Sequence, residues 1–416
     1  MEGVFRAIGI TVTLLNVVVL LALWRRIRVA FPKHGRLVCA LVAVPYALLL
    51  HPALLLAVGP FSGMYSYRHQ APMWVQVPAM AFQFAVWAYG ALLLAWGTPA
   101  AIADAVRKLR ALLRGTPAAA PEADLANADR RRAMAKAALA APAAIVAFAT
   151  GGALASRATP VVRHLRLPVP RNLTVLHGLT IAQVSDVHVG SYMDRARLRE
   201  ILDVINAVGA DFHVVTGDLL DNHVNQLEDA CWFLRSLQPQ RETFMCMGNH
   251  EYIAARTADE AAIVAGLRST PAALLIDEAR KVQVGGAHFW MGGIDYPPQR
   301  GLEKSVARNS DVSLQAALGA MADDGAPRIV LSHHPAAFHA GRDMALDLML
   351  SGHTHGGQIV AGRLGDWALS PVLPFEFYHN GYYEHEGRRL YVNSGAGGWM
   401  PVRINCPPEI TVVHFT

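Results

Sequence analysis

Five short clusters of polar residues stand out because imidazole, carboxylate and amide groups recur within them at close spacing. They are Asp186-Val-His188, Gly217-Asp218-Leu-Leu-Asp221, Gly248-Asn249-His250-Glu251, His333-His334 and Gly352-His353-Thr-His355. Side chains two apart in an extended chain point to one side, so each Asp-x-His or His-x-His pair can face a common ligand. Imidazole with oxygen donors suits Zn, Mn, Fe or Ni, and no thiolate is placed to favour a soft metal. At least seven such donors are present, more than one ion needs, and a bridging carboxylate could hold two ions about 3.5–4 Å apart, as in phosphoryl hydrolysis.

Nearly every cluster comes directly after a predicted strand. The predicted strands are Leu179–Val184, Phe212–Thr216, Thr243–Met247, His288–Gly292, Arg328–Ser332, Leu346–Leu350, Leu390–Val392 and Ile410–Phe415. The predicted helices are Asp194–Val208, Gln226–Leu237, Ala258–Arg268 and Val312–Ala322. This alternation indicates βαβ units in a layered α/β fold. Because sites in open α/β sheets form beyond the carboxyl ends of strands, the five clusters are expected to converge. Glycines at 217, 248 and 352 allow tight turns and close backbone approach.

Taken together, the five clusters resemble the signature of the calcineurin-like metallophosphoesterases. Their membrane-anchored bacterial branch is similar in further runs: His353-Thr-His-Gly-Gly-Gln358, Tyr391-Val-Asn-Ser-Gly395 through Pro401, Arg403 and Cys406-Pro-Pro-Glu-Ile410. The resemblance covers about residues 173–416. It implies a four-layer metallophosphoesterase β-sandwich flanked by helices. It also implies two divalent transition-metal ions (Mn, Fe or Zn) and hydrolysis of phosphoester bonds by a hydroxide that bridges the ions.

The resemblance also implies a role for each site residue. One metal is held by Asp186, His188 and His355, the other by Asn249, His333 and His353, and Asp218 bridges both. His250 assists the leaving oxygen or the developing phosphoryl charge without contacting a metal. His333 rather than His334 keeps the His-x-Pro register of the family.

Two further residues each have two interpretations. Asp221 either orients the site or simply belongs to a turn or helix start. Arg403 either donates to a substrate phosphate in bidentate fashion or forms a structural ion pair.

Composition excludes several protein classes. Of 416 residues, 53% are hydrophobic and 17% charged, which excludes a disordered chain, a collagen and a disulfide-rich mini-protein. Residues 1–159 contain 16 Lys and Arg against 5 Asp and Glu, whereas residues 160–416 contain 21 against 27. The basic charge lies between apolar segments and the half with the polar clusters is acidic, so nucleic acid is not expected as the main partner. The four cysteines lack metal or disulfide spacing and are expected to be small buried hydrophobes.

The first half predicts a multi-pass transmembrane region, residues 1–159, ahead of a metallophosphoesterase domain, residues 160–416. Four apolar stretches could span a bilayer: Val4–Trp24, Leu37–Val58, Met73–Trp96 and Ala137–Ala155. The fourth, preceded by Arg130–Arg132 and ending in Ala153-Leu-Ala155, also has the pattern of an export signal that is cleaved after Ala155. Pro160–Pro170 is predicted to be a linker to the second domain.

Loop charge predicts the orientation of these spans. Residues 25–36 hold five Lys and Arg and residues 97–136 hold eight, against one in residues 59–72. Because basic loops stay in the cytoplasm, the catalytic domain is expected on the periplasmic side of a bacterial inner membrane, with membrane lipids as partners.

Two alternatives remain. If the domain faces the cytoplasm, a lipid-linked pyrophosphate such as a UDP-diacylglucosamine-like lipid A precursor becomes a candidate substrate. Alternatively, the first half is a sensor or transport module that carries a regulated phosphoesterase.

Overall fold

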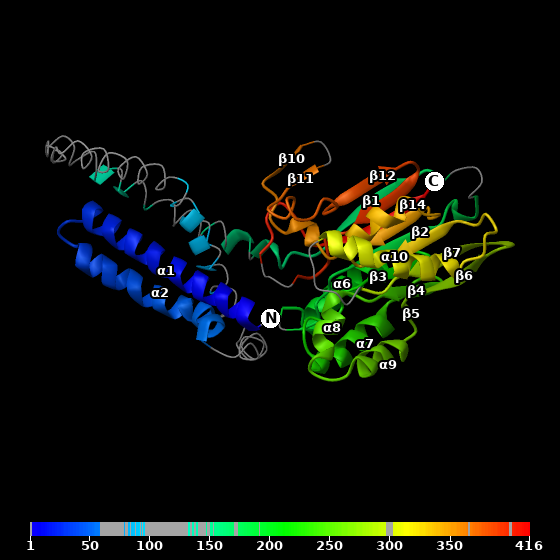
Figure 1. The fold of residues 1–416 in the computed structure, drawn as a ribbon, viewed down its shortest axis with the longest axis horizontal. Coiled ribbons are helices and arrows are strands. Elements are labelled where there is room, and N and C mark those ends of the chain that lie inside the picture. The colour runs from blue at the N-terminus through cyan, green and yellow to red at the C-terminus, as the bar shows by residue number, and fades with distance from the viewer. Residues whose placement is uncertain are drawn as a thin grey trace. The chain divides into compact units, whose positions relative to one another are not determined.

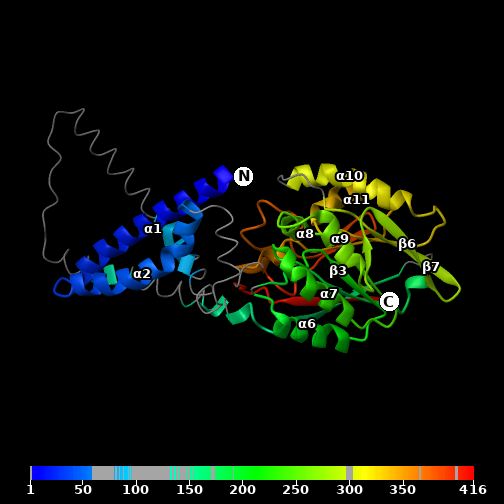
Figure 2. The same ribbon diagram turned by 90° about the horizontal axis from the view of Figure 1, so that it is seen from below.

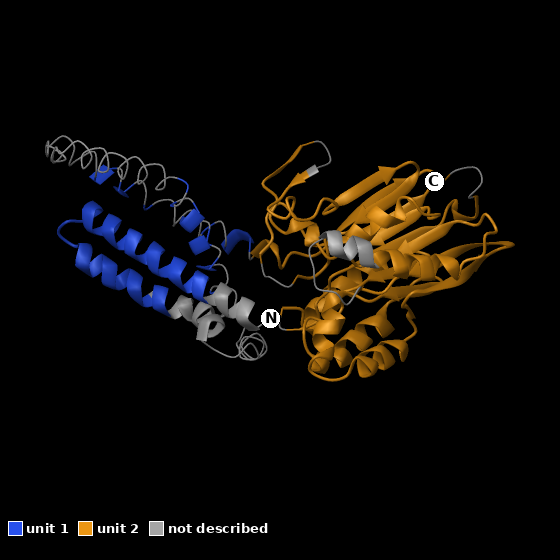
Figure 3. Cartoon of the chain, in the orientation of Figure 1, with its two compact units in different colours: residues 1–153 blue, residues 154–416 orange. Residues whose placement is uncertain are grey.

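The computed structural model describes residues 2–58, 154–169, 174–190, 192–296, 303–364, 367–398 and 402–416, with scattered positions between 79 and 152. The chain divides into two compact units, residues 1–153 and 154–416 (Figure 3).

Two long helices dominate the described part of the first unit: α1 (Glu2–Ala30) and α2 (Gly35–Val58). Val19 and Leu23 of α1 and Tyr46 of α2 belong to one buried apolar cluster. Within α1, Ile10–Ala30 is long and apolar enough to cross a membrane, and α2 contributes a shorter apolar stretch, Gly35–Val44.

The structure thus shows one candidate membrane span among the described residues, where the sequence predicts four. It overlaps the first predicted stretch, Val4–Trp24. The second, Leu37–Val58, is helical within α2. Met73–Trp96 and Ala137–Ala155 lie largely outside the described residues. The four-span arrangement therefore stays a prediction.

Two six-stranded sheets and a small hairpin form the frame of the second unit (Figure 1). The first sheet has the order β1 (Val161–Leu167), β14 (Glu409–Phe415), β2 (Thr180–Val184), β3 (Phe212–Thr216), β4 (Glu242–Cys246), β5 (Ala273–Leu275). The second has the order β12 (Gly381–His385), β13 (Arg388–Val392), β9 (Leu348–Ser351), β8 (Arg328–Leu331), β7 (Ala287–Gly293), β6 (Glu278–Val284). The hairpin pairs β10 (Gly362–Leu364) with β11 (Trp367–Leu369).

Strand direction explains where the polar clusters meet. β2, β3, β4 and β5 run parallel to one another in the first sheet. In the second sheet, β7, β8, β9 and β13 are also mutually parallel. The carboxyl ends of parallel strands share one edge of a sheet, which places the loops after β2, β3, β4, β8 and β9 together.

Helices cover the outer face of each sheet. The helices on the first sheet are α6 (Arg195–Ala207), α7 (Leu227–Ser236), α8 (Asn249–Ala255) and α9 (Glu260–Arg268), and those on the second are α10 (Glu303–Gly319) and α11 (Phe338–Gly341). Figure 2 shows α10 and α11 on one side of the unit and α6 on the opposite side. Short 3-10 turns are η1 (Thr174–Leu176), η2 (Val224–Gln226), η3 (Pro335–Ala337) and η4 (His355–Gly357).

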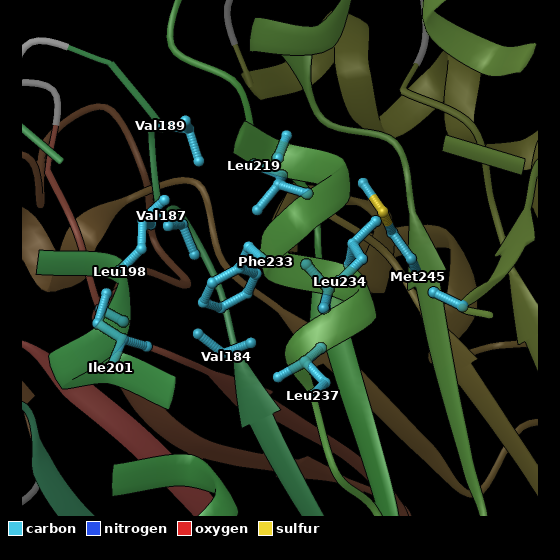
Figure 4. Close-up of a cluster of buried hydrophobic side chains, with 14 of the residues drawn as sticks. Val184, Val187, Val189, Leu198, Ile201, Leu219, Phe233, Leu234, Leu237 and Met245 are labelled. Carbon is cyan, nitrogen blue, oxygen red and sulfur yellow. The ribbon is translucent and has the colours of Figure 1, made fainter. Parts of the chain in front are cut away.

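Separate apolar cores join these layers. Between the sheets, Phe212 and Phe244 of the first sheet pack with Phe289 of the second. Under the helices of the first sheet, Leu198 of α6 and Phe233 of α7 belong to a second core (Figure 4). α6 fits this position because Asp194 caps its first turn, accepting from Arg197 N, and its buried residues recur at helical spacing: Leu198, Ile201, Leu202 and Ile205.

All eight predicted strands and all four predicted helices are present, with ends shifted by up to three residues, except that α10 begins nine residues before the predicted Val312. The prediction that Pro160–Pro170 is a linker is wrong, because Val161–Leu167 forms edge strand β1, paired in parallel with β14. Its prolines flank the strand, where no ladder hydrogen bond is lost, and Leu167 is buried between the sheets. The four cysteines are buried and free, as predicted.

Candidate metal centre

The loops after the strands hold the polar side chains in strained conformations. Five of the seven predicted metal ligands have positive φ angles between 50° and 71°: Asp186, His188, Asp218, His353 and His355. L-residues with large side chains rarely adopt this conformation, which costs about 1–3 kcal/mol each and is concentrated at functional sites. These residues therefore keep conformations that lower the stability of the fold, as is common at functional sites.

Glycines let these loops approach one another. A Cβ atom at Gly217, which has a φ of 80°, would collide with the imidazole of His333. Added at Gly248 it would collide with Asp218, and at Gly352 with Asp186. The expected close backbone approach at these three positions is confirmed.

Asp186, His188 and His355 form the first group of side chains and are all buried. His188 Nε2 lies 3.1 Å from His355 Nε2, which in turn lies 3.4 Å from Asp186 Oδ1. The Asp186 carboxylate also accepts the main-chain N–H of His353 at 3.0 Å, which ties the loop after β2 to the loop after β9.

Asp218, His333 and His353 form the second group, which Asn249 joins. Asn249 Oδ1 lies 3.1 Å from His333 Nε2 and 2.9 Å from His353 Nδ1, and these two nitrogens are 3.2 Å apart. His333 Nδ1–H donates to Thr216 O at 2.8 Å, which orients the ring and turns Nε2 toward the group.

The Asp218 carboxylate lies between the two groups. Its Oδ2 atom is 3.2 Å from His333 Nε2 in the second group and 3.7 Å from His188 Nε2 in the first. Its Oδ1 atom accepts the main-chain N–H of His250 at 2.8 Å, which fixes the carboxylate at the start of α8.

The spacing and chemistry of these donors fit divalent ions. Two ligand atoms bound to one ion at about 2.0–2.1 Å stand about 3.0–3.4 Å apart, and separations of 2.9–3.4 Å occur within both groups. Ring nitrogens at such distances repel unless a proton or a cation lies between them. The donor set is nitrogen and oxygen throughout, which suits Zn, Mn or Fe.

Burial and mutual charge set the protonation of the donors. Burial lowers the pKa of His353 and of His355 well below the usual range, so both rings are neutral at pH 7 with lone pairs available. Burial and the neighbouring Asp218 raise the pKa of Asp186 to about 6, against an opposing effect of His333. Burial lowers the pKa of His333, but Asp218 outweighs it and raises the value to about 9. A cation that replaced the proton on His333 would interact with the buried carboxylate of Asp218 and with the neutral rings of the site.

His250 and Asp221 lie at the border of the first group. The His250 ring contacts the His188 ring edge-on at 4.4 Å, and His250 Nδ1 bonds to the carbonyl oxygen of Asp221. The Asp221 carboxylate lies 3.7 Å from His188 Nδ1, on the side of that ring away from Asp218. His250 is partly exposed, unlike His188 and Asp221.

Arg403 is buried and donates to main-chain carbonyl groups. One guanidinium nitrogen lies 2.8, 3.0 and 2.7 Å from the carbonyl oxygens of Ser394, Gly395 and Gly397. The other donates to Cys406 O at 3.2 Å. These contacts hold the loop that carries Gly395, at which a Cβ atom would touch Asp186 and His355.

Glu251 organises the site, although the sequence analysis assigns it no role. Its carboxylate accepts the main-chain N–H groups of Gly248, Asp218, Leu219 and Leu220 at 2.7–3.0 Å. It thereby joins the loops after β3 and β4. The sequence signal was available: Glu251 stands three residues after the helix cap at Gly248, the spacing of a capping box.

Two more residues near the second group were missed. The Tyr296 ring lies about 6 Å from the rings of His333 and His353, at 6.0 and 6.1 Å. Glu376 lies 3.4 Å from His334 Nε2, and the His334 ring packs 4.3 Å from the His353 ring. His334 thus faces Glu376, while His333 faces Asp218. Nothing in the local sequence marks Tyr296 or Glu376, since only the tertiary fold brings them here.

The sequence is similar to those of several known proteins. Similar proteins include an uncharacterized metallophosphoesterase of Helicobacter pylori strain J99, 31% identical over 240 residues, 57% of this chain and 60% of that protein. A transmembrane protein with metallophosphoesterase domain from Danio rerio is 30% identical over 260 residues, 61% of this chain and 56% of that protein. The chain thus spans less than two thirds of these relatives.

A further relative is covered almost completely. UDP-2,3-diacylglucosamine pyrophosphatase LpxG of Chlamydia trachomatis is 27% identical over 295 residues, 61% of this chain and 88% of that protein. Residues 179–357, which contain every predicted metal ligand, match the family model of the calcineurin-like phosphoesterases. The chain therefore carries a calcineurin-like metallophosphoesterase domain.

Proposed function

We propose that the chain is a membrane-anchored, metal-dependent phosphoesterase. One observation carries the proposal: two groups of His and Asp side chains approach the single carboxylate of Asp218. In the proposal, Asp186, His188 and His355 would hold one ion, Asn249, His333 and His353 would hold the other, and Asp218 would contact both. Bound ions supply Lewis acidity, which polarises a phosphoryl oxygen and lowers the pKa of an adjacent water toward about 7.

The protein's own side chains position and stabilise the reacting groups. Asp221 O holds His250 Nδ1, which leaves Nε2 of this partly exposed ring to face a phosphoryl or leaving oxygen. Glu251 holds the loops after β3 and β4 in register by four main-chain N–H bonds. Arg403 keeps the Gly395 loop against Asp186, a positioning role rather than contact with substrate.

A lipid-linked pyrophosphate is the second candidate substrate. The similarity to LpxG supports it, because it extends over 88% of that protein. In this alternative the catalytic domain faces the cytoplasm, whereas the loop charges favour four spans and a periplasmic domain in a bacterial inner membrane.

A substrate comparison tests the proposal. The full chain in phosphatidylcholine nanodiscs is assayed with p-nitrophenyl phosphate, bis(p-nitrophenyl) phosphate and UDP-diacylglucosamine, in the presence of Mn²⁺, Zn²⁺ or Fe²⁺. We expect hydrolysis of at least one, lost in Asp218→Asn. Failure of all three with every metal, or equal rates for wild type and Asp218→Asn, contradicts the proposal.

A further inference from the structure

An exposed apolar surface lies on the segment that follows the His353 and His355 loop. Leu364, Leu369, Phe375 and Phe377, here called the apolar ridge, are exposed by 74%, 43%, 65% and 44%. Tyr382, exposed by 37%, follows closely in the chain. Among the described residues of the second unit, most of the exposed large hydrophobic side chains fall in this short stretch. Such concentration marks an interaction surface, because isolated exposed hydrophobes are normally scattered.

The hairpin explains why part of the ridge faces outward. β10 and β11 stand apart from both large sheets (Figure 1), and Gly362 pairs with Leu369. Residues directly opposite or two apart share a face of a hairpin, so Leu364 and Leu369 lie on the same face. The other face presents Ala368, which is buried against Val360 and Cys406. The hairpin is therefore anchored by one face and exposes the other.

The ridge segment is bonded to the candidate metal centre. His379 Nε2 donates to Ala368 O at 2.8 Å, which closes the segment on itself. Thr354, between the two ligand histidines, donates its hydroxyl to His379 O at 2.6 Å. Glu376, between Phe375 and Phe377, pairs with His334, whose ring packs on His353. The segment that carries the ridge is thus bonded to the loop that carries His353 and His355.

We propose that the apolar ridge binds the hydrocarbon chain of an amphipathic phosphate ester whose phosphate lies at the candidate metal centre. The inference rests on the proposed function and names its substrate class. A centre that would hold cations, bonded to a segment with exposed apolar side chains, would be complementary to one molecule that carries both a phosphate and a hydrocarbon chain. The chain's own candidate membrane span, Ile10–Ala30, would anchor the protein to a membrane that contains such lipids.

Chain-length selectivity tests this assignment. Binding of dodecylphosphonate and of ethylphosphonate to the full chain in phosphatidylcholine nanodiscs is measured by calorimetry. The dodecyl and ethyl esters of p-nitrophenyl phosphate are then compared as substrates by their kcat/KM values. We expect the double variant Leu364→Ser/Phe375→Ser to lower the dodecyl-to-ethyl ratio of both measurements by at least about 10-fold, since one buried Leu or Phe contributes that much.

Val312→Ser is the matched control. Val312 lies on α10 outside the ridge and is 72% exposed. Its substitution therefore removes an exposed apolar side chain from another surface. It should keep the wild-type ratio, and thermal unfolding of both variants reports whether the fold is retained. A wild-type protein without preference for dodecyl chains overturns the inference. A ridge variant that keeps the full preference overturns it equally.

The two measurements separate this inference from the proposed function. If the proposed function is wrong, the wild type hydrolyses neither ester. The ratio of dodecylphosphonate binding to ethylphosphonate binding still tests the ridge in that case. Failure of the inference alone appears as hydrolysis of both esters with a ratio that the ridge variant leaves unchanged.

Discussion

Asp218 and His250 occupy different places at the centre, and their variants should differ accordingly. The Asp218 carboxylate approaches both groups of ligands, whereas His250 touches the border of one. Asp218→Asn should therefore lower the bound metal, measured by elemental analysis, more than His250→Ala does. His250→Ala should keep the metal and lower kcat by about 10²–10⁴-fold, the usual contribution of a general acid or base. Loss of all metal from His250→Ala would contradict this division of roles.

A variant of Arg403 tests whether this residue positions a loop or contacts the substrate. Its removal takes the guanidinium donor away from the buried carbonyl groups of Ser394, Gly397 and Cys406, and each loss costs about 1–3 kcal/mol. Arg403→Met should therefore lower the thermal midpoint of the second unit by about 5–10 °C. If the midpoint stays unchanged while KM rises, Arg403 contacts substrate instead.

At the scale of elements, the sequence pattern predicted the strands and helices that depend mainly on neighbouring residues. The strands that precede the polar clusters are short apolar runs, three of them followed closely by Gly217, Gly248 or Gly352, and these strands were found. β1 was missed because its partner, β14, is distant in sequence and prolines stand at both ends. All seven predicted metal ligands, which the structure brings together in two groups, stand in motifs that the sequence itself displays. Glu376 and Tyr296 reach the site only through tertiary packing, which no local spacing encodes.

Strand β3 carries a buried histidine that should make stability depend on pH. Neither ring nitrogen of His213 has a hydrogen-bond partner among the described residues, and burial lowers its pKa from 6.5 to about 4. The unfolded chain therefore binds a proton that the folded chain does not between pH 6.5 and about 4. Stability is fully present above pH 6.5 and falls on acidification, by about 3 kcal/mol at pH 4.

His213→Leu should remove this part of the pH dependence. Thermal unfolding of wild type and variant is followed across this pH window with chelator present, so that metal release affects neither. The variant should lose less stability than the wild type on acidification. Parallel curves for the two proteins would show that His213 does not titrate on unfolding.

At the scale of the whole molecule, the side of the membrane decides which phosphoesters the site can meet. Thirteen Lys and Arg in two predicted loops, against one in the loop between them, favour an external catalytic domain after four spans. Alkaline phosphatase fused at the C-terminus should be active, and the same reporter fused after Thr116 should be inactive. Activity at Thr116 alone would reverse the topology and favour the cytoplasmic lipid-linked pyrophosphate.

Metal dependence tests the central claim most directly. The full chain in nanodiscs is analysed for bound transition metals and assayed with bis(p-nitrophenyl) phosphate before and after treatment with a chelator. The account predicts bound metal in the untreated protein, loss of hydrolysis on chelation, and recovery on addition of Mn²⁺, Zn²⁺ or Fe²⁺. Hydrolysis that continues unchanged in a chelated protein free of transition metal would contradict it.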